Sequence, residues 1–156
     1  MKMAGLSETD TASKTRLRLW LRLLKLSRHV EGELRDNLRR NFATTLPRFD
    51  VMAALDRFPG GLKMSELSGV LMVSNGNVTG IIDRLETDGS VERIPVPGDR
   101  RASRVRLTAK GEKEFSLQAT EHAAWISRIF EEIDDETAVT TMNMLEKVNI
   151  STKDGG

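Results

Sequence analysis

Apolar residues between positions 14 and 42 recur with helical spacing and fall on two sides of the predicted helix. One side holds Leu17, Trp20, Leu21, Leu24, Leu38 and Phe42, and the other holds Leu19, Leu23, Leu26 and Val30. A stripe of Arg18, Arg22, Lys25 and His29 separates them. Because both apolar sides must be buried, we expect helix 14–42 to lie between two bodies. Residues 1–13 are polar and are expected to form a disordered tail.

Two short helices joined by a brief turn are predicted after a first short helix in "TTLPRFDVMAALDRFPGG". That first helix has Thr45 as its N-cap, Pro47 in its first turn and an apolar side of Phe49, Met52, Ala53 and Phe58. "KMSELSGVL" has room for two turns, with Leu67, Val70 and Leu71 inward. The next helix, in "VSNGNVTGIIDRL", has Ser74 as its cap, runs to Asp88 and buries Val78, Ile81, Ile82 and Leu85. This pair is typical of a helix-turn-helix.

The pattern then changes to a two-residue period in "SVERIPVPGDRRASRVRLT", which predicts a β-hairpin with its turn at Pro97 and Gly98. Its strands contain Val91 and Ile94, and Val105 and Leu107. Thr108 caps a long helix whose apolar side is Phe115, Ala119, His122, Ala123, Ile126, Phe130 and Ile133. A last helix begins at Asp134 or Asp135, with Ala138, Met142, Leu145 and Val148 inward. The expected fold is mainly α with a small β-hairpin wing.

Composition removes several functional classes. The 156 residues include no cysteine, which excludes disulfides, thiolate zinc sites and thiol redox switches. No run of apolar residues is long enough for a membrane span, and the N-terminal residues do not resemble a signal peptide, so we expect a cytoplasmic protein without membrane contact. The net charge of +1 is unevenly distributed, since residues 91–110 hold six basic and two acidic residues. A nearly neutral protein can therefore present a basic stripe to an anionic partner.

The helix in "VSNGNVTGIIDRL" places Gly76, Gly80 and Asp83 opposite its buried side, with Asn77, Thr79 and Arg84 beside them. Glycines that face outward let a helix backbone approach a surface closely, and amide, hydroxyl and guanidinium groups can then reach base edges in a major groove. Ser74 and Asn75 at the helix start favour a phosphate. The alternative is that the glycines only avoid a clash with a neighbouring helix.

The hairpin tip carries Asp99, Arg100 and Arg101 and directly follows this helix. Arginines of this kind enter a narrow minor groove or neutralise phosphates, and Asp99 is a candidate for orienting one of them. We include Arg104, on the following strand, among the DNA contacts. The alternative is a solvated, charged loop.

The stretch "SNGNVTGIIDRLETDGSVER", followed by "PGDRRASRVRLTAKGEKEF", resembles the recognition helix, the wing and the start of the dimer helix of the MarR family of bacterial transcription regulators. The resemblance covers roughly residues 47–115. It implies a winged helix-turn-helix domain over 47–107 and a helical dimerisation region formed by 14–46 and 108–150. It also implies an obligate homodimer that binds a palindromic promoter site on double-stranded DNA and is released by a small aromatic acid or a related thioester. By position, Asn75, Asn77, Thr79 and Arg84 become groove or phosphate contacts, and Arg100 and Arg101 become wing-tip contacts.

Members of the family bind effectors between the dimer helices and the winged domain, so candidate ligand residues come from both. They are Trp20, Arg28, Phe49, His122 and Trp125. A cation at Arg28 could hold a carboxylate, although pairing with Glu31 one turn further on is the simpler interpretation. The two tryptophans, Phe49 and His122 have an equally simple role as core residues.

An enzyme is the competing class, but the two histidines lie on separate helices and no Walker, H-x-x-x-H or G-x-S-x-G pattern occurs. We therefore predict no enzymatic activity and no cofactor or metal. The remaining alternative is an architectural DNA-binding or interaction protein that senses no ligand. Such a protein would bind DNA without a preferred sequence. The sequence favours a ligand-responsive regulator, most simply a repressor.

Overall fold

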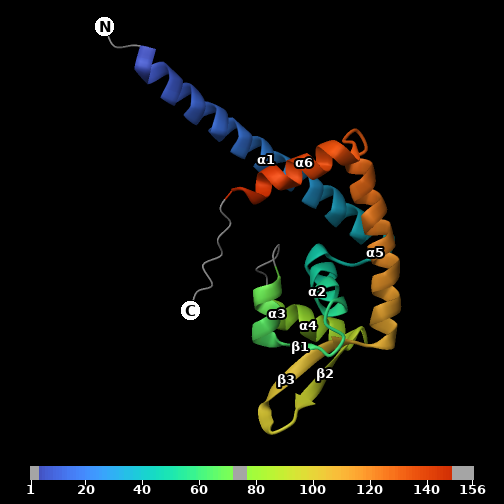
Figure 1. Ribbon diagram of the computed structural model, residues 1–156. Coiled ribbons are helices and arrows are strands. Elements are labelled where there is room, and N and C mark those ends of the chain that lie inside the picture. The colour runs from blue at the N-terminus through green and yellow to red at the C-terminus, as the bar shows by residue number, and fades with distance from the viewer. Residues whose placement is uncertain (1–3, 72–76, 149–156) are drawn as a thin grey trace.

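The computed structural model describes residues 4–71 and 77–148 of the chain (Figure 1). Its elements are α1 (Ala4–Phe42), α2 (Leu46–Asp56), β1 (Leu62–Lys63), α3 (Met64–Val70), α4 (Val78–Thr87), β2 (Val91–Val96), β3 (Asp99–Leu107), α5 (Ala109–Ile129) and α6 (Asp135–Glu146). The three strands form one antiparallel sheet in the order β1-β3-β2. The predicted fold class, mainly helical with a small β-hairpin, is confirmed.

Helix α1 is longer than predicted, because it begins at Ala4 and not at residue 14. Most of the segment expected to be a disordered tail is therefore helical. No glycine or proline occurs between Leu6 and Glu31, so nothing in that stretch stops the helix. In Figure 1 the N-terminal part of α1 projects away from the rest of the molecule.

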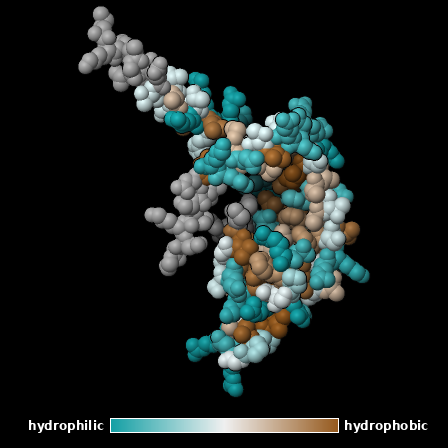
Figure 2. Space-filling view, in the orientation of Figure 1, coloured by the Kyte–Doolittle hydropathy of each residue, from teal (hydrophilic) through white to brown (hydrophobic). Residues whose placement is uncertain are grey.

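The apolar sides of α1 are not both buried within one chain. Its buried apolar residues, in the part whose burial is described, are Leu34 and Leu38 near the C-terminal end. Leu17, Trp20 and Leu21 each expose more than half of their accessible surface. The space-filling view shows hydrophobic surface where α1 and α6 cross (Figure 2). The predicted burial on two sides therefore needs something beyond a single chain.

The core lies in the winged domain around α2, which contributes Leu46, Phe49, Val51, Met52, Ala54 and Leu55. The predicted cap is confirmed, because the Thr45 hydroxyl accepts a hydrogen bond from the backbone N–H of Arg48. Phe58, predicted to face inward, is 42% exposed instead. It lies past the end of α2, where the chain turns towards β1, so the helical spacing no longer applies to it.

Helix α4 begins at Val78, with Asn77 as its N-cap. Ser74, the cap predicted from the sequence, lies outside the described residues, as do Asn75 and Gly76. Ile82 and Leu85 are buried as predicted, and Val78 and Ile81 are partly buried. The helix is thus shorter at its start than the sequence pattern indicates.

The hairpin has the predicted strands, with Val91 opposite Leu107 and a turn at Gly98. A third strand, β1, was not predicted. Its two residues pair with β3, Leu62 lying opposite Val105. Two residues show no period, so a strand this short leaves no pattern in the sequence.

Helix α5 begins after Thr108, whose hydroxyl accepts a hydrogen bond from the backbone N–H of Gly111, as predicted. Its buried side differs from the prediction. Gln118 and Trp125 are buried, whereas Ala123 and Ile133 are exposed. Helix α6, capped by Asp134, has no buried residue, and the residues predicted to face inward include Met142, which is 54% exposed. No helix in residues 4–71 or 77–148 combines the length and apolar character needed to cross a membrane.

Candidate nucleic-acid interface and ligand cavity

The outer surface of α4 presents Thr79, Gly80 and Arg84 to solvent, as the sequence predicts. Asp83 is also exposed, but its carboxylate forms an ion pair with Arg93 of β2. Arg84 forms an ion pair with Asp88, with Nε and Oδ2 3.3 Å apart, and its side chain remains more than half exposed. These residues form a polar strip that a partner can approach.

Asn77 has a structural role that its predicted base contact did not include. Its side-chain oxygen accepts a hydrogen bond from the backbone N–H of Gly80, 3.1 Å away, which caps α4. A Cβ atom on Gly80 would lie 3.1 Å from the amide nitrogen of Asn77, so this glycine leaves room for the cap. A two-point contact of Asn77 with adenine would have to break or share the capping bond.

Four arginines line a groove of about 470 Å³ between the end of α1, the start of α2 and one side of α4. They are Arg35, Arg39, Arg48 and Arg84, and no acidic side chain lines the groove. Within the described part of the chain, Arg35, Arg39 and Arg48 form no ion pair. This arginine groove adjoins the polar strip of α4 and offers positive charge to an anion. The groove leaves no pattern in the sequence, because its arginines come from three separate helices.

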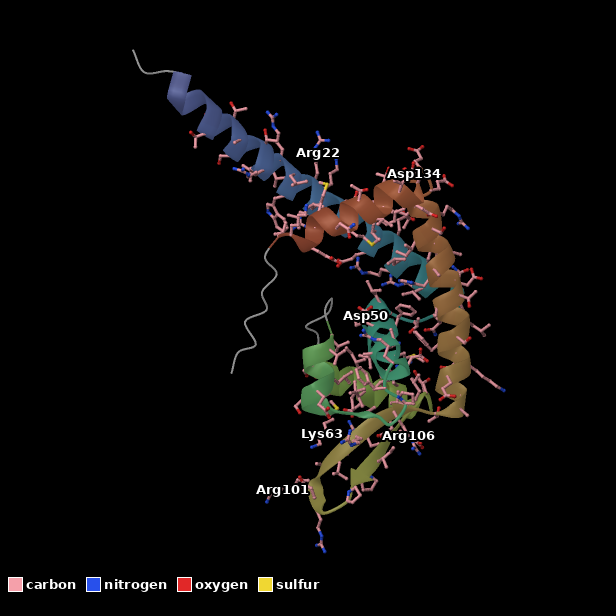
Figure 3. All side chains as sticks on the ribbon, viewed as in Figure 1. Arg22, Asp50, Lys63, Arg101, Arg106 and Asp134 are labelled. Atoms are coloured by element: carbon pink, nitrogen blue, oxygen red, sulfur yellow. The ribbon has the colours of Figure 1, made fainter. Side chains whose placement is uncertain are left out.

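The hairpin tip carries Arg100 and Arg101, both exposed, and Arg101 points away from the molecule (Figure 3). Asp99 does not orient a guanidinium group here. Its carboxylate accepts a hydrogen bond from the backbone N–H of Arg101, 3.0 Å away, and so shapes the turn. The tip thus presents two arginines that have no ion pair among the described residues.

Arg104 differs from the tip arginines, although the sequence grouped it with them. Its guanidinium donates a hydrogen bond to the carbonyl of Gly61, 3.4 Å away, and lies 3.8 Å from the carboxylate of Glu66. Arg104 therefore connects β3 with the segment around β1 and α3. Its position gives it a bracing role within the sheet.

Arg93 connects the hairpin to α4 and was not singled out from the sequence. From β2, its guanidinium lies 2.7 Å from the carboxylate of Asp83 and 3.5 Å from that of Glu86, both on α4. The two acidic residues are three apart on one helix, so one arginine can reach both. This pairing sets the orientation of the wing relative to α4.

A cavity of about 460 Å³ lies between α1, α2 and α5. Phe49 and His122 stack on its wall, with ring centroids 4.5 Å apart and an interplanar angle of 24°. Glu31, Asp50 and Ser27 supply the other polar side chains, and aliphatic residues together with Phe130 complete the lining. Figure 3 shows Asp50 on the part of α2 that faces α1. An apolar cavity with a few convergent polar groups is the usual form of a small-molecule site.

Electrostatics in this cavity are unusual for two side chains. Burial, and to a smaller extent the charge of Glu31, raise the pKa of the Asp50 carboxyl from 3.8 to about 6. Its Oδ2 atom is buried and has no hydrogen-bond partner in the described part of the chain. Burial also lowers the pKa of His122, so its imidazole is neutral at pH 7. A titratable group perturbed in this way inside a cleft marks a candidate functional site.

The structure brings together two of the five predicted ligand residues, Phe49 and His122. Trp20 is 56% exposed on the projecting part of α1. Arg28 is exposed, does not line the cavity and forms no ion pair with Glu31. Trp125 is buried near Phe42, with ring centroids 6.3 Å apart. Arg28 was assigned to the ligand site only because of its angular position on the predicted helix. In the structure, the side of α1 that carries Arg28 does not face the cavity.

The raised pKa of Asp50 predicts that the free energy of unfolding depends on pH at this residue. A carboxyl whose pKa is higher in the folded state contributes its full stabilisation below pH 3.8 and loses it as pH rises through about 6. We expect Asp50→Asn to raise the free energy of unfolding at pH 8 by about 1 kcal/mol, allowing for partial exposure, with no gain at pH 4. Urea unfolding of both proteins at the two pH values measures this. Asp56→Asn, on the exposed end of α2, should change neither value, and an equal effect of Asp50→Asn at both pH values would contradict the assignment.

Comparison with known proteins places the chain in a family. Residues 44–103 match the sequence model of the MarR family. The HTH-type transcriptional regulator YsmB of Bacillus subtilis is 30% identical over 115 residues, which are 72% of this chain and 78% of that protein. The chain belongs to the MarR family. Its members are transcription regulators and not enzymes, so the predicted class is confirmed.

Solved structures of MarR-family proteins share the fold. A MarR family transcriptional regulator from Silicibacter pomeroyi is 33% identical, with a TM-score of 0.76, and the match covers 88% of this chain and 94% of that one. A mutant MarR from E. coli, solved in complex with operator DNA, is 24% identical with a TM-score of 0.74, covering 86% of this chain and 96% of that one. At that identity, the second likeness shows the fold alone.

Proposed function

We propose that this MarR-family regulator binds a palindromic promoter site through two copies of the surface formed by α4, the arginine groove and the hairpin tip. The observation that carries the proposal is the continuity of these three features. Exposed Thr79 and Arg84 on α4 adjoin the other three groove arginines, which form no ion pair with any described residue. The wing that carries Arg101 is joined to α4 by Arg93. Base edges are read by short polar side chains, and phosphates are neutralised by arginine. A MarR of the same fold has been solved in complex with operator DNA, which supports duplex DNA as the partner.

The proposed assembly is a homodimer built from α1, α5 and α6. The exposed apolar residues of α1 have counterparts on α6, where Val139, Met142 and Met144 are each at least half exposed. Apolar helices that find no cover within their own chain call for a partner, and interlocked dimers of this kind bury more than about 2,000 Å². Two recognition helices in successive major grooves place the half-site centres about 10 bp apart.

The proposed response is release of DNA when a small effector fills the cavity that contains Phe49 and His122. The cavity touches α1 and α5 of the dimerisation region as well as α2 of the winged domain, so its occupancy can alter how the two parts sit together. The resemblance to the family implies an aromatic acid or a related thioester, and repression in its absence. An acid would have to enter the cavity close to Glu31 and Asp50.

Variants on α4 and on the wing test the DNA surface. Thr79→Ala should cost about 1 to 3 kcal/mol on the preferred site and relax the preference at one position in each half-site. Arg101→Ala should weaken binding to preferred and random duplexes more evenly and lower the salt slope by about one for each lost phosphate contact. Selection of a preferred duplex from a random pool, followed by titration at several salt concentrations, measures both.

Arg128→Ala provides the control for these titrations, because Arg128 lies in the last turn of α5 and lines neither the arginine groove nor the cavity between α1, α2 and α5. It should leave the affinity and the salt slope unchanged. Asn77→Ala is less suitable than Thr79→Ala, because loss of the cap would itself destabilise α4 by about 1 kcal/mol. The proposal fails if no preferred duplex emerges, and the two roles are reversed if Arg101→Ala changes the preferred sequence while Thr79→Ala changes affinity alone.

A further inference from the structure

We propose that the cavity between α1, α2 and α5 binds an organic cation, with its charged nitrogen beside Asp50 and Glu31 and its apolar body against Phe49. This inference rests on the proposed function only where DNA release is the readout. Binding of the cation requires only the cavity within a single chain and does not depend on DNA binding. It differs from the aromatic acid that the resemblance to the family implies.

The first argument is the balance of charge in the cavity lining. Glu31 comes from α1 and Asp50 from α2, and no lysine or arginine lines the cavity. His122 does not supply a positive charge, because burial lowers its pKa. At neutral pH, an entering carboxylate therefore meets acidic groups and no cation, whereas an ammonium group meets complementary charge.

The second argument is the unpaired acceptor on Asp50. Its Oδ2 atom is buried without a hydrogen-bond donor in the described part of the chain. A buried carboxylate oxygen without a partner destabilises the empty protein, and a donor that enters with a ligand removes that penalty. A charged N–H donor forms the stronger kind of hydrogen bond with a carboxylate. The cavity thus lacks the chemical group that such a ligand brings.

The third argument is the aromatic wall. Phe49 is 5% exposed and is held between Phe115, 5.5 Å away between ring centroids, and the stacked His122. Because His122 covers a face of the Phe49 ring, the remaining surface of Phe49 offers apolar contact, and Phe130 adds a second ring to the lining. The volume of about 460 Å³ is ample for a compound of one or two rings. An arylalkylamine combines these requirements, because its ammonium group is protonated at neutral pH and carries N–H donors.

Three probes of matched skeleton separate the possibilities: tryptamine is a cation, tryptophol is neutral and indolepropionate is an anion. Calorimetric titration of the full chain at pH 8, where Asp50 is ionised, should show tryptamine binding at least tenfold more tightly than tryptophol. Indolepropionate should bind most weakly. Asp50→Asn should lower the tryptamine affinity at least tenfold and narrow the preference for tryptamine over the other two probes, while Asp56→Asn should behave as wild type.

Glu31→Gln should also reduce the tryptamine affinity. This second variant keeps the inference testable if the Asp50→Asn protein does not fold. Indolepropionate binding as tightly as tryptamine, or no binding of tryptamine at millimolar concentration, would overturn the inference. A separate titration of tryptamine into the complex of the protein with its preferred duplex measures whether the protein releases the DNA. Tryptamine that binds to the free protein but leaves the duplex bound would overturn the proposed response and not the cation site.

Discussion

Replacing Gly111 with alanine is expected to destabilise the protein by about 3 kcal/mol or more, the largest effect we predict for a single methyl group. A Cβ atom at Gly111 would lie 1.9 Å from the carbonyl oxygen of Ser90 and 2.9 Å from its carbonyl carbon. Both atoms belong to backbone, which cannot rotate aside. The same oxygen accepts a hydrogen bond from the backbone N–H of Thr108, and the Thr108 hydroxyl donates to the carbonyl of Gly89. The start of α5 and the entry to β2 are therefore fixed against one another.

Thermal and urea unfolding of the Gly111→Ala protein measure the effect, with Gly69→Ala as the matched control. Gly69 is exposed in α3, and a Cβ atom there would meet nothing within 4 Å. That substitution should raise the free energy of unfolding by about 0.5 to 1 kcal/mol, because alanine is the better helix residue. Equal stability of the Gly111→Ala protein and the wild type would show that the start of α5 leaves room for a methyl group beside the Ser90 carbonyl.

Acidic substitutions on the exposed apolar surface should abolish the homodimer and with it high-affinity DNA binding. Trp20 on α1 is 56% exposed and Leu145 on α6 is 39% exposed in the single chain. A carboxylate at either position would be buried without a partner in the dimer. We expect Trp20→Glu and Leu145→Glu to yield monomers, and loss of the second half-site contact to weaken operator binding by about 100-fold.

Sedimentation at micromolar concentration, followed by DNA titration, tests this expectation. Phe58→Glu introduces the same change at a 42% exposed aromatic residue beyond the end of α2, and it should leave the dimer intact. A folded wild-type monomer at those concentrations would contradict the proposed assembly. Dimers that persist in both the α1 and α6 variants would move the interface elsewhere.

Local chemistry explains which parts of the fold could be predicted from the sequence. The caps at Thr45 and Thr108 were identified correctly, because a hydroxyl before a helix bonds to backbone three residues ahead and needs nothing from the rest of the chain. The start of α1 was misplaced for the opposite reason. Polar residues before position 14 suggested a tail, although no residue there stops a helix.

Site residues were predictable where one element carries them. Thr79 on α4 and Arg101 at the hairpin tip lie exposed where the pattern placed them. Asp50 was not singled out, because its burial depends on α1 and α5, which are distant in sequence. Arg28 was placed in the ligand site by its angle on a helix, and a helix angle does not say which side meets α2.

The ion pairs of Arg93 with Asp83 and Glu86 have a consequence for the choice of DNA sequence. They join the element proposed to enter the major groove to the element proposed to reach the minor groove, so the two cannot adjust their separation independently. A duplex whose grooves are spaced differently must then bend or change its groove width to meet both. The energy of that deformation depends on the stacking of the base pairs in between. Base pairs that no side chain touches should therefore contribute to operator preference, and Arg93→Gln should reduce their contribution.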